Sequence, residues 1–382
     1  MKSSESPVAL VPGGEVAPGE RIDFGRPMVV AFGRRIDVRV VVIAGIVTLL
    51  ALVCGFLGLL LGKFALTPTE VFQGLFGVAD KRIVNTVVGE WRAPRILAGI
   101  VLGAGLGVSG AVFQSLTRNP LGSPDIIGFS TGAYTGGIVT IILFGTSFVS
   151  TAFGAILGGI LTALLVYVLT WKGGVQGFRL IIVGIALTAM LNAFNTWLIM
   201  RSDLDLAMAA ATWGAGTLNG MGWSTILPAT VAVIVLGLGC GVFARDLGTL
   251  EFGDDTAKAL GVRNEPVRAA LILIAVALVA VVTAAAGPIA FVALAAPQIG
   301  RRIAKSQGTS LLMAAAVGGL LLVAADLIAQ HGMALTNQLL VWLGVIGVDA
   351  ADDIQFPVGV VTVCIGGVYL IWLLIHEARK AP

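Results

Sequence analysis

Long uninterrupted apolar runs, separated by short polar segments, dominate this chain and limit the folds open to it. About 20 apolar residues in a helix span the hydrocarbon of a bilayer. Lipid offers the backbone no hydrogen bonds, so each spanning segment must satisfy its own polar groups as a helix. About ten runs approach this length, at approximately 40–62, 96–116, 126–146, 148–170, 180–200, 224–244, 266–286, 288–300, 311–330 and 355–376. The sequence therefore predicts an all-α polytopic membrane protein with about ten transmembrane helices.

Charge supports this prediction and divides the chain into two parts. Only 12% of the 382 residues are charged, against about 25% in an ordinary soluble domain. Residues 1–39 are polar and include five arginines between Arg21 and Arg39. We expect them to form a partly disordered N-terminal tail, disordered up to about Gly25, with no cleaved signal peptide. The ten-helix domain is expected to occupy 40–382.

The distribution of lysine and arginine predicts the orientation. These residues favour cytoplasmic loops, and the pattern is satisfied best with both termini in the cytoplasm. One predicted external segment, between the first two runs, breaks the rule. It contains Lys63, Lys81, Arg82, Arg92 and Arg95. We interpret Arg92 and Arg95, which are nearest the second run, as a docking site for an acidic external partner.

A cytoplasmic segment near 247–265 has the pattern of a short helix outside the membrane. Asp254 and Asp255 follow Gly253 and suit a helix N-terminus, whereas Gly261 suits the C-terminal end. We expect Ala257 and Leu260 to share one face that docks into a groove of a soluble partner. The alternative is an ordinary solvated loop.

Two other features leave functional and structural interpretations open. Asp326 lies near the end of the ninth run, where an ionisable residue is either functional or a helix-end acid that reaches water or a backbone amide. After the second run, two prolines and a glycine within 115–124 prevent a continuous helix. This break either lines a pore or is a simple turn.

Several motifs have no catalytic meaning here. The GxGxxG pattern at 105–110 lies inside an apolar run, where close helix packing explains it better than a nucleotide site. Glycines four residues apart at Gly99, Gly103 and Gly107, and again at Gly154 and Gly158, predict closely packed membrane helices. We find no Walker A sequence, no catalytic arrangement around the two histidines and no metal-ligand spacing. We expect neither enzymatic activity nor a metal or nucleic-acid partner.

From about residue 40 to the C-terminus, the chain resembles the permeases of bacterial ABC importers for ferric siderophores, haem and cobalamin, known as type II importers. The resemblance depends on an ordered series of short motifs rather than on any single one. The motifs are RAPR at 92–95, SGAVFQ at 109–114, NPL at 119–121, GFSTGA at 128–133, the segment 253–261, GPIAFV at 287–292, APQIGR at 296–301, AD at 325–326 and PVGVVT at 357–362.

The resemblance implies ten helices, a second permease subunit, two cytosolic ATPase subunits that bind ATP and Mg, and an extracytoplasmic substrate-binding protein. The permease itself would bind no cofactor. Arg92 and Arg95 match the arginines that pair with glutamates of the binding protein. The segment 251–262 matches the coupling helix that contacts the ATPase, and Asn119 and Leu121 match the cytoplasmic gate.

The chain also departs from the family pattern. The family often has an arginine four residues after the aspartate of the ninth helix, where this chain has Gln330. The external connection from about Met333 to Asp353 is lengthened. We therefore expect a heterodimer with a different permease in preference to a homodimer. Ferric siderophore is the expected cargo, with cobalamin or haem as alternatives and an ion-coupled secondary transporter as the rival outside the family.

Overall fold

The computed structural model describes residues 28–31, 34–62, 64–145, 147–170, 177–306, 308–342 and 355–378. The chain divides into two compact units, Met1–Arg39 and Val40–Pro382. In the first unit, β1 (Met28–Ala31) pairs antiparallel with β2 (Arg34–Asp37). The all-α prediction missed this hairpin, whose valines and isoleucine favour extended backbone. The disorder predicted before Gly25 lies outside the described residues.

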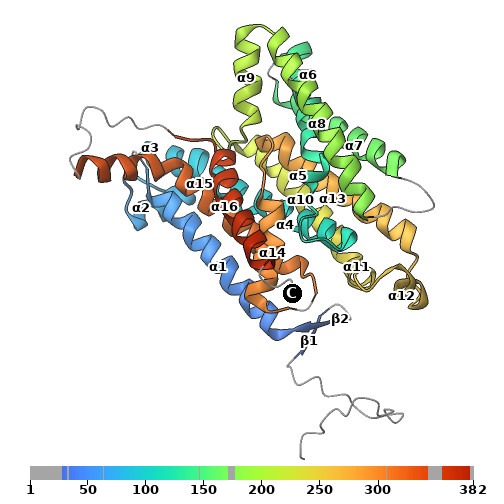
Figure 1. Ribbon diagram of the computed structural model, residues 1–382. Coiled ribbons are helices and arrows are strands. Elements are labelled where there is room, and N and C mark those ends of the chain that lie inside the picture. Colours follow the sequence, from blue (N-terminus) through green and yellow to red (C-terminus); the bar gives the residue numbers. More distant parts are fainter. Residues whose placement is uncertain are drawn as a thin grey trace, which may run out of the picture. The chain divides into compact units, whose positions relative to one another are not determined.

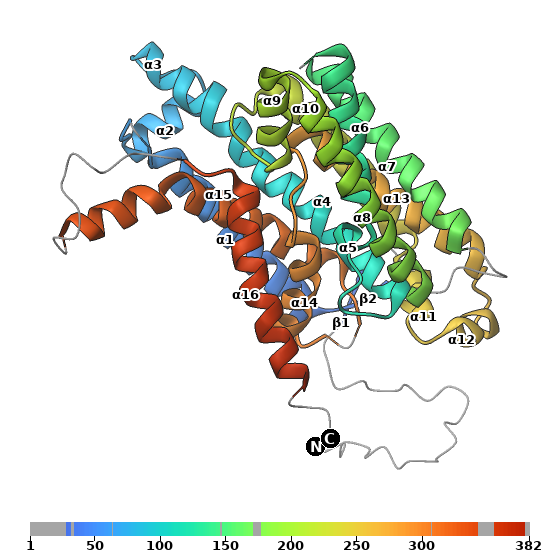
Figure 2. The ribbon, with the colours of Figure 1, turned by 45° about the horizontal axis from the view of Figure 1, so that its top comes forward.

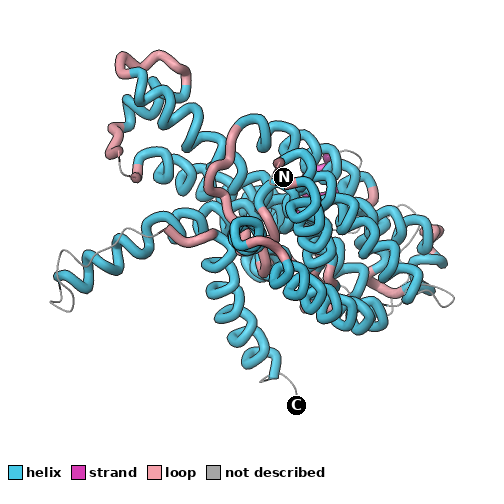
Figure 3. The backbone as a smooth tube through the Cα atoms, turned by 90° about the horizontal axis from the view of Figure 1, so that it is seen from above, coloured by secondary structure: helices cyan, strands magenta, loops and turns pink. Residues whose placement is uncertain are grey.

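The described backbone of the second unit is helical, as the cyan tube in Figure 3 shows. In chain order, with α1 starting just before the unit boundary, the helices are α1 (Val38–Leu60), α2 (Pro68–Leu75), α3 (Arg82–Asn85), the π-helix η1 (Thr86–Arg92), α4 (Ala93–Thr117), α5 (Pro124–Ile127), α6 (Phe129–Phe144), α7 (Phe148–Thr170), α8 (Gly177–Arg201), α9 (Leu204–Gly214), α10 (Trp223–Val242), α11 (Ala244–Leu250), α12 (Asp254–Ala259), α13 (Asn264–Ala286), α14 (Val292–Ala304), α15 (Leu311–Trp342) and α16 (Val358–Ala378) (Figure 1).

Seven helices in the described part of the chain are long and apolar enough to cross a membrane. They are α1, the continuous stretch Arg82–Thr117, α7, α8, α10, α13 and the first 24 residues of α15. Helix α6 and the first part of α16 are apolar but shorter. These helices, together with α14, coincide with the ten apolar runs of the sequence.

Helix α4 is buried along most of its length, against α10, α13, α14 and α15. A Cβ added at Gly103 would collide with the carbonyl oxygen of Gly318, and one at Gly107 with that of Ala314. The two backbones of α4 and α15 therefore touch directly, which only glycine permits. The predicted role of these glycines in close helix packing is confirmed.

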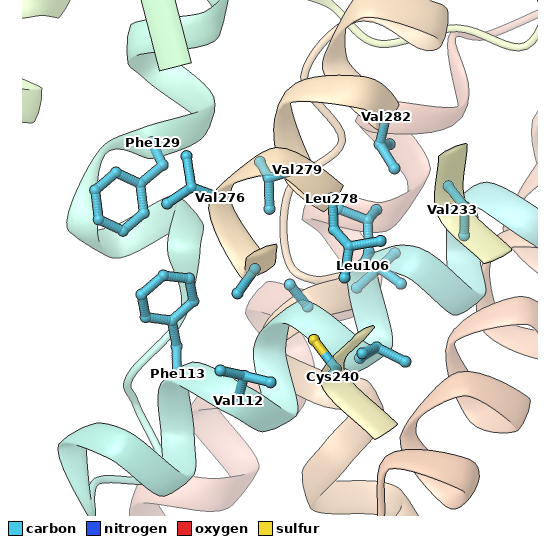
Figure 4. Close-up of a cluster of buried hydrophobic side chains, with 14 of the residues drawn as sticks. Leu106, Val112, Phe113, Phe129, Val233, Cys240, Val276, Leu278, Val279 and Val282 are labelled. Carbon is cyan, nitrogen blue, oxygen red and sulfur yellow. The ribbon is translucent and has the colours of Figure 1, made fainter. Parts of the chain in front are cut away.

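The largest apolar core surrounds α4 and α13 (Figure 4). Phe113 of α4 and Phe129 of α6 pack with their ring centroids 5.2 Å apart. The other labelled side chains come from α4, α10 and α13: Leu106, Val112, Val233, Cys240, Val276, Leu278, Val279 and Val282. This core fixes α4 relative to α13, which carries one of the charged residues described below.

Two predicted boundaries change. The second span begins near Arg82 rather than residue 96, because α3 and η1 continue into α4 (Figure 2). The supposed connection from Met333 begins as helix, since α15 runs on to Trp342, while 343–354 lie outside the described residues. Pro297 lies inside α14, whose first seven residues are all buried, so protein surrounds the proline.

Candidate functional site

Arg95, Asp326 and Gln330 form a buried cluster near the start of α4, called here the Arg95 cluster. Arg95 Nε and Nη2 each donate to a different oxygen of Asp326 at 2.8 Å, which makes a bidentate ion pair. Gln330 Nε2 donates to Asp326 Oδ2 at 2.7 Å. The side chains of Arg95 and Asp326 are only 15% and 6% exposed. Both carboxylate oxygens are therefore satisfied, and the pair joins α4 to α15.

Arg92 is also occupied inside the chain. Its Nη1 donates to the carbonyl oxygen of Leu59 at 2.6 Å and its Nη2 to that of Phe64 at 2.9 Å. Leu59 lies in the last turn of α1, where carbonyl groups have no partner within the helix and attract cations. Arg92 thus caps α1 and holds the segment that follows it.

These contacts supply an internal reason for the charge anomaly in the sequence. Asp326 neither reaches water nor binds a backbone amide, as the non-functional interpretation proposed, because it pairs with Arg95. Among the described residues of 61–95, the exposed cations are instead Arg82 and Lys81, which lies 3.6 Å from Glu70. Binding-protein docking by Arg92 and Arg95 stays a prediction, now for two arginines that already have partners.

The opposite end of α4 leads into the predicted gate segment, residues 119–121. Helix α4 ends at Thr117, and Arg118 adopts a left-handed conformation with φ of 50°, which turns the chain sharply. Asn119 Oδ1 accepts a hydrogen bond from the Leu121 N–H at 2.9 Å. Asn119 therefore shapes the turn, and Leu121 is half-buried. The predicted break in the helix is confirmed.

Gln114 ties this end of α4 to α14. Its Nε2 donates to the carbonyl oxygen of Leu294 at 2.9 Å, and its Oε1 accepts from Gln298 Nε2 at 2.6 Å. Gln298 Nε2 also lies 3.4 Å from the carbonyl oxygen of Pro120. Both glutamines are buried. A polar connection thus runs from α4 through α14 to the gate segment.

Asp254 joins α12 to two other helices in what we call the Asp254 cluster. Its Oδ1 accepts from Arg118 Nη2 at 3.2 Å and from Arg268 Nη2 at 2.9 Å. Arg268, in α13, is 6% exposed and also lies 3.5 Å from Glu265, whereas Arg118 is 47% exposed. Nearby, Ser115 Oγ donates to Glu251 Oε1 at 2.6 Å. One carboxylate therefore connects the end of α4 with the start of α13.

The predicted coupling helix exists as α12, but its exposed face differs from the prediction. Ala257 is fully buried in the main core, while Leu260 and Phe252 are 68% and 77% exposed. The expectation that Ala257 and Leu260 share a docking face is wrong, because α12 packs its alanine against the bundle. The available apolar side chains are Phe252 and Leu260, at the two ends of the segment.

The turns around α12 depend on glycine. Gly261, with φ of 85°, follows the last turn, as the sequence predicted. The N-cap is Gly253, with φ of 110°, and not one of the two aspartates that the sequence favoured for capping. Asp254 and Asp255 occupy the first helical turn. Asp255 is exposed, so the two acids have different surroundings despite their adjacent positions.

Sequence reasoning missed the partners of the predicted residues. The sequence placed Glu251 in the cytoplasmic segment near 247–265, and Gln114 and Gln298 in family motifs, without assigning partners to them. Arg268 offered a signal, because an arginine one turn into an apolar helix needs an acid nearby. Within the described ranges, no group of three or more His, Cys, Asp or Glu residues could hold a metal ion.

Comparisons with known proteins show the family of the chain. Residues 49–348 match the profile of the FecCD transport family. The chain belongs to this family. It is 48% identical over 328 residues to the ferric enterobactin transport system permease protein FepG of Escherichia coli strain K12, covering 86% of this chain and 94% of FepG.

Two further similarities extend the comparison. The iron(3+)-hydroxamate import system permease protein FhuG of Bacillus subtilis strain 168 is 34% identical over 342 residues, covering 87% of this chain and 96% of FhuG. A solved metal-chelate type ABC transporter in an inward-facing conformation superposes with a TM-score of 0.73 at 27% identity. That match covers 88% of this chain and 99% of the other.

Proposed function

We propose that this FecCD family member is the permease subunit of an ATP-driven importer that takes up a ferric siderophore across the cytoplasmic membrane of a bacterium. The observation that carries the proposal is the coupling segment. A short helix, α12, packs Ala257 into the bundle and is flanked by the exposed apolar side chains of Phe252 and Leu260. Together with the similarity to FepG along most of the chain, this favours ATP-driven import of a related ligand.

The proposed topology has ten crossings with both termini in the cytoplasm. The bias of lysine and arginine toward one side supports it. In this orientation α12 and the gate segment face the cytoplasm, and the Arg95 cluster lies toward the outside. Helix α14 has only 13 residues, about 20 Å at 1.5 Å per residue, so it would cross only with the help of the preceding extended segment.

The proposed partners follow from the same assignment. Two cytosolic ATPase subunits would bind ATP and Mg and drive the change between outward- and inward-facing states. A second permease would complete the path, and a heterodimer remains our preference. An acidic binding protein would deliver the ligand near Arg92 and Arg95. We expect ATP to bind those ATPase subunits rather than this chain.

Uptake into reconstituted vesicles tests the proposal. The chain would be produced together with the ATPase, second permease and binding protein proposed above, purified as a complex and placed in liposomes with ATP inside. We expect ATP-dependent uptake of ferric enterobactin labelled with radioactive iron, and none when ADP replaces ATP. Uptake of cobalamin or haem alone would assign a different cargo. Uptake that does not require ATP but stops when the proton gradient is dissipated would identify a secondary transporter.

A further inference from the structure

Asp254 is placed where it connects the helix that faces the ATPase with the segment that closes the path. On one side it begins α12, and Asn264 Nδ2 also donates to its backbone carbonyl at 2.7 Å. On the other side its carboxylate reaches Arg118, and Arg118 directly precedes the gate segment. Arg118 and Asn119 are adjacent in the sequence, so a pull on Arg118 acts at the start of that turn.

The two arginines that share Asp254 are not equivalent. Arg268 is almost wholly buried in α13 and has Glu265 as a second partner, so it holds the start of α12 against the bundle. Arg118 is about half exposed and sits at a left-handed turn at the end of α4. The contact with Arg268 is thus the buried one of the two, while the 3.2 Å contact with Arg118 is half exposed and links α12 to the end of α4.

A second contact runs parallel to the first. Ser115, one turn before Arg118 on α4, donates to Glu251, which lies just before α12. The same hydroxyl lies 2.8 Å from Thr309 Oγ1, at the start of α15. The last turn of α4 therefore touches the coupling segment at two acids, one on each side of Gly253.

We propose that Arg118 and Asp254 transmit the movement of α12 to the gate segment within one subunit, with Arg268 as the fixed anchor. The proposal rests on the importer function given above and names positioning residues within it. The Arg118–Asp254 ion pair is only one of the contacts between α4 and the coupling segment. Its loss should therefore weaken the coupling of uptake to ATP hydrolysis without stopping hydrolysis itself. A coupling contact of this kind is worth about five-fold or more in an equilibrium constant.

The test compares Arg118→Gln with Arg245→Gln in the complete complex in liposomes. Arg245 is an exposed arginine on neighbouring α11, so its change removes the same charge from the same side. The measured quantity is ligand taken up per ATP hydrolysed, with ferric enterobactin as the probe. We expect Arg118→Gln to lower this ratio about five-fold, with hydrolysis retained, and Arg245→Gln to leave it unchanged.

Further variants separate the possible outcomes. Arg118→Lys, which keeps the charge, should restore much of the ratio, and Asp254→Asn should lower it as Arg118→Gln does. An unchanged ratio in an assembled Arg118→Gln complex would overturn the proposal. An equal fall in hydrolysis and uptake would also overturn it, because Arg118 would then act in ATPase contact. Failure of the unmodified complex to transport would instead contradict the importer function.

Discussion

The two charged clusters at the ends of α4 both combine arginine with aspartate, but in different proportions. In the Arg95 cluster, one arginine and one aspartate satisfy each other through two short hydrogen bonds, out of reach of most water. In the Asp254 cluster, a single oxygen of one aspartate serves two arginines, one buried and one half exposed. The Arg95–Asp326 pair therefore fixes α4 to α15. Asp254, in contrast, could lose its contact with Arg118 and still keep its contact with Arg268.

The comparison predicts its largest effect at Asp326. Asp326→Ala would leave Arg95 buried without its counter-charge, and we expect it to lower the free energy of unfolding by about 3–5 kcal/mol. The double change Arg95→Met with Asp326→Leu should recover most of this loss, because neither charge then remains buried. Denaturation by SDS in mixed micelles measures both variants. If Asp326→Ala were as stable as the double variant, Arg95 would not depend on Asp326 as its counter-charge.

A smaller loss is expected at the fixed side of the Asp254 cluster. Arg268→Met removes a charged hydrogen bond from the start of α12 and should cost about 1–3 kcal/mol of unfolding free energy. Arg118→Gln should cost about 0–1 kcal/mol, since exposed ion pairs contribute little. The same micelle titration compares them. Equal losses of unfolding free energy in the two variants would show that Arg268 anchors α12 no more strongly than Arg118 does.

The exposed ends of the coupling segment predict an effect on association alone. Phe252→Ser with Leu260→Ser removes two apolar contacts from the proposed ATPase interface, and each such contact is worth about 1 kcal/mol or more when it is central. We expect weaker retention of the ATPase during purification and an unchanged unfolding midpoint. Ala257→Glu serves as the contrast, because that buried site should lower stability first.

The smallest effect concerns binding-protein docking at the Arg95 end. Arg92→Gln removes charge without placing a new acid near Asp326, and should weaken docking by up to about five-fold at low salt. Arg82→Gln, at an exposed arginine of α3, is the matched control. Binding of the purified binding protein to the permease in nanodiscs gives both affinities. A loss confined to Arg82→Gln would move the docking site to the tip of that segment.

The sequence predicted correctly those features that depend on a single span or on the few residues at one end of a helix. Apolar runs predicted the membrane helices, and glycines four residues apart predicted the contact of α4 with α15. Asp254, Asp255 and Gly261 predicted α12 because caps and turns are local properties. The break after Thr117 followed from prolines for the same reason.

Contacts between distant segments could not be read in this way. Arg95 and Asp326 were both singled out, yet they are 231 residues apart and nothing in the sequence pairs them. The burial of Ala257 depends on packing against the bundle rather than on the periodicity of its six-residue helix. The sequence did not predict the helical segment that leads into α4. Thr86–Arg92 is too polar to resemble part of a spanning helix, yet it forms the π-helix η1.

The length of α15 has a practical consequence. Its 32 residues extend about 48 Å at 1.5 Å per residue, well beyond the roughly 30 Å of hydrocarbon. The end that follows Ala334 must therefore project into water or force a steep tilt. Thr336, exposed in that projection and outside both clusters, is a natural position for an engineered cysteine. A membrane-impermeant maleimide applied to whole cells would then report which face of the bilayer this end occupies.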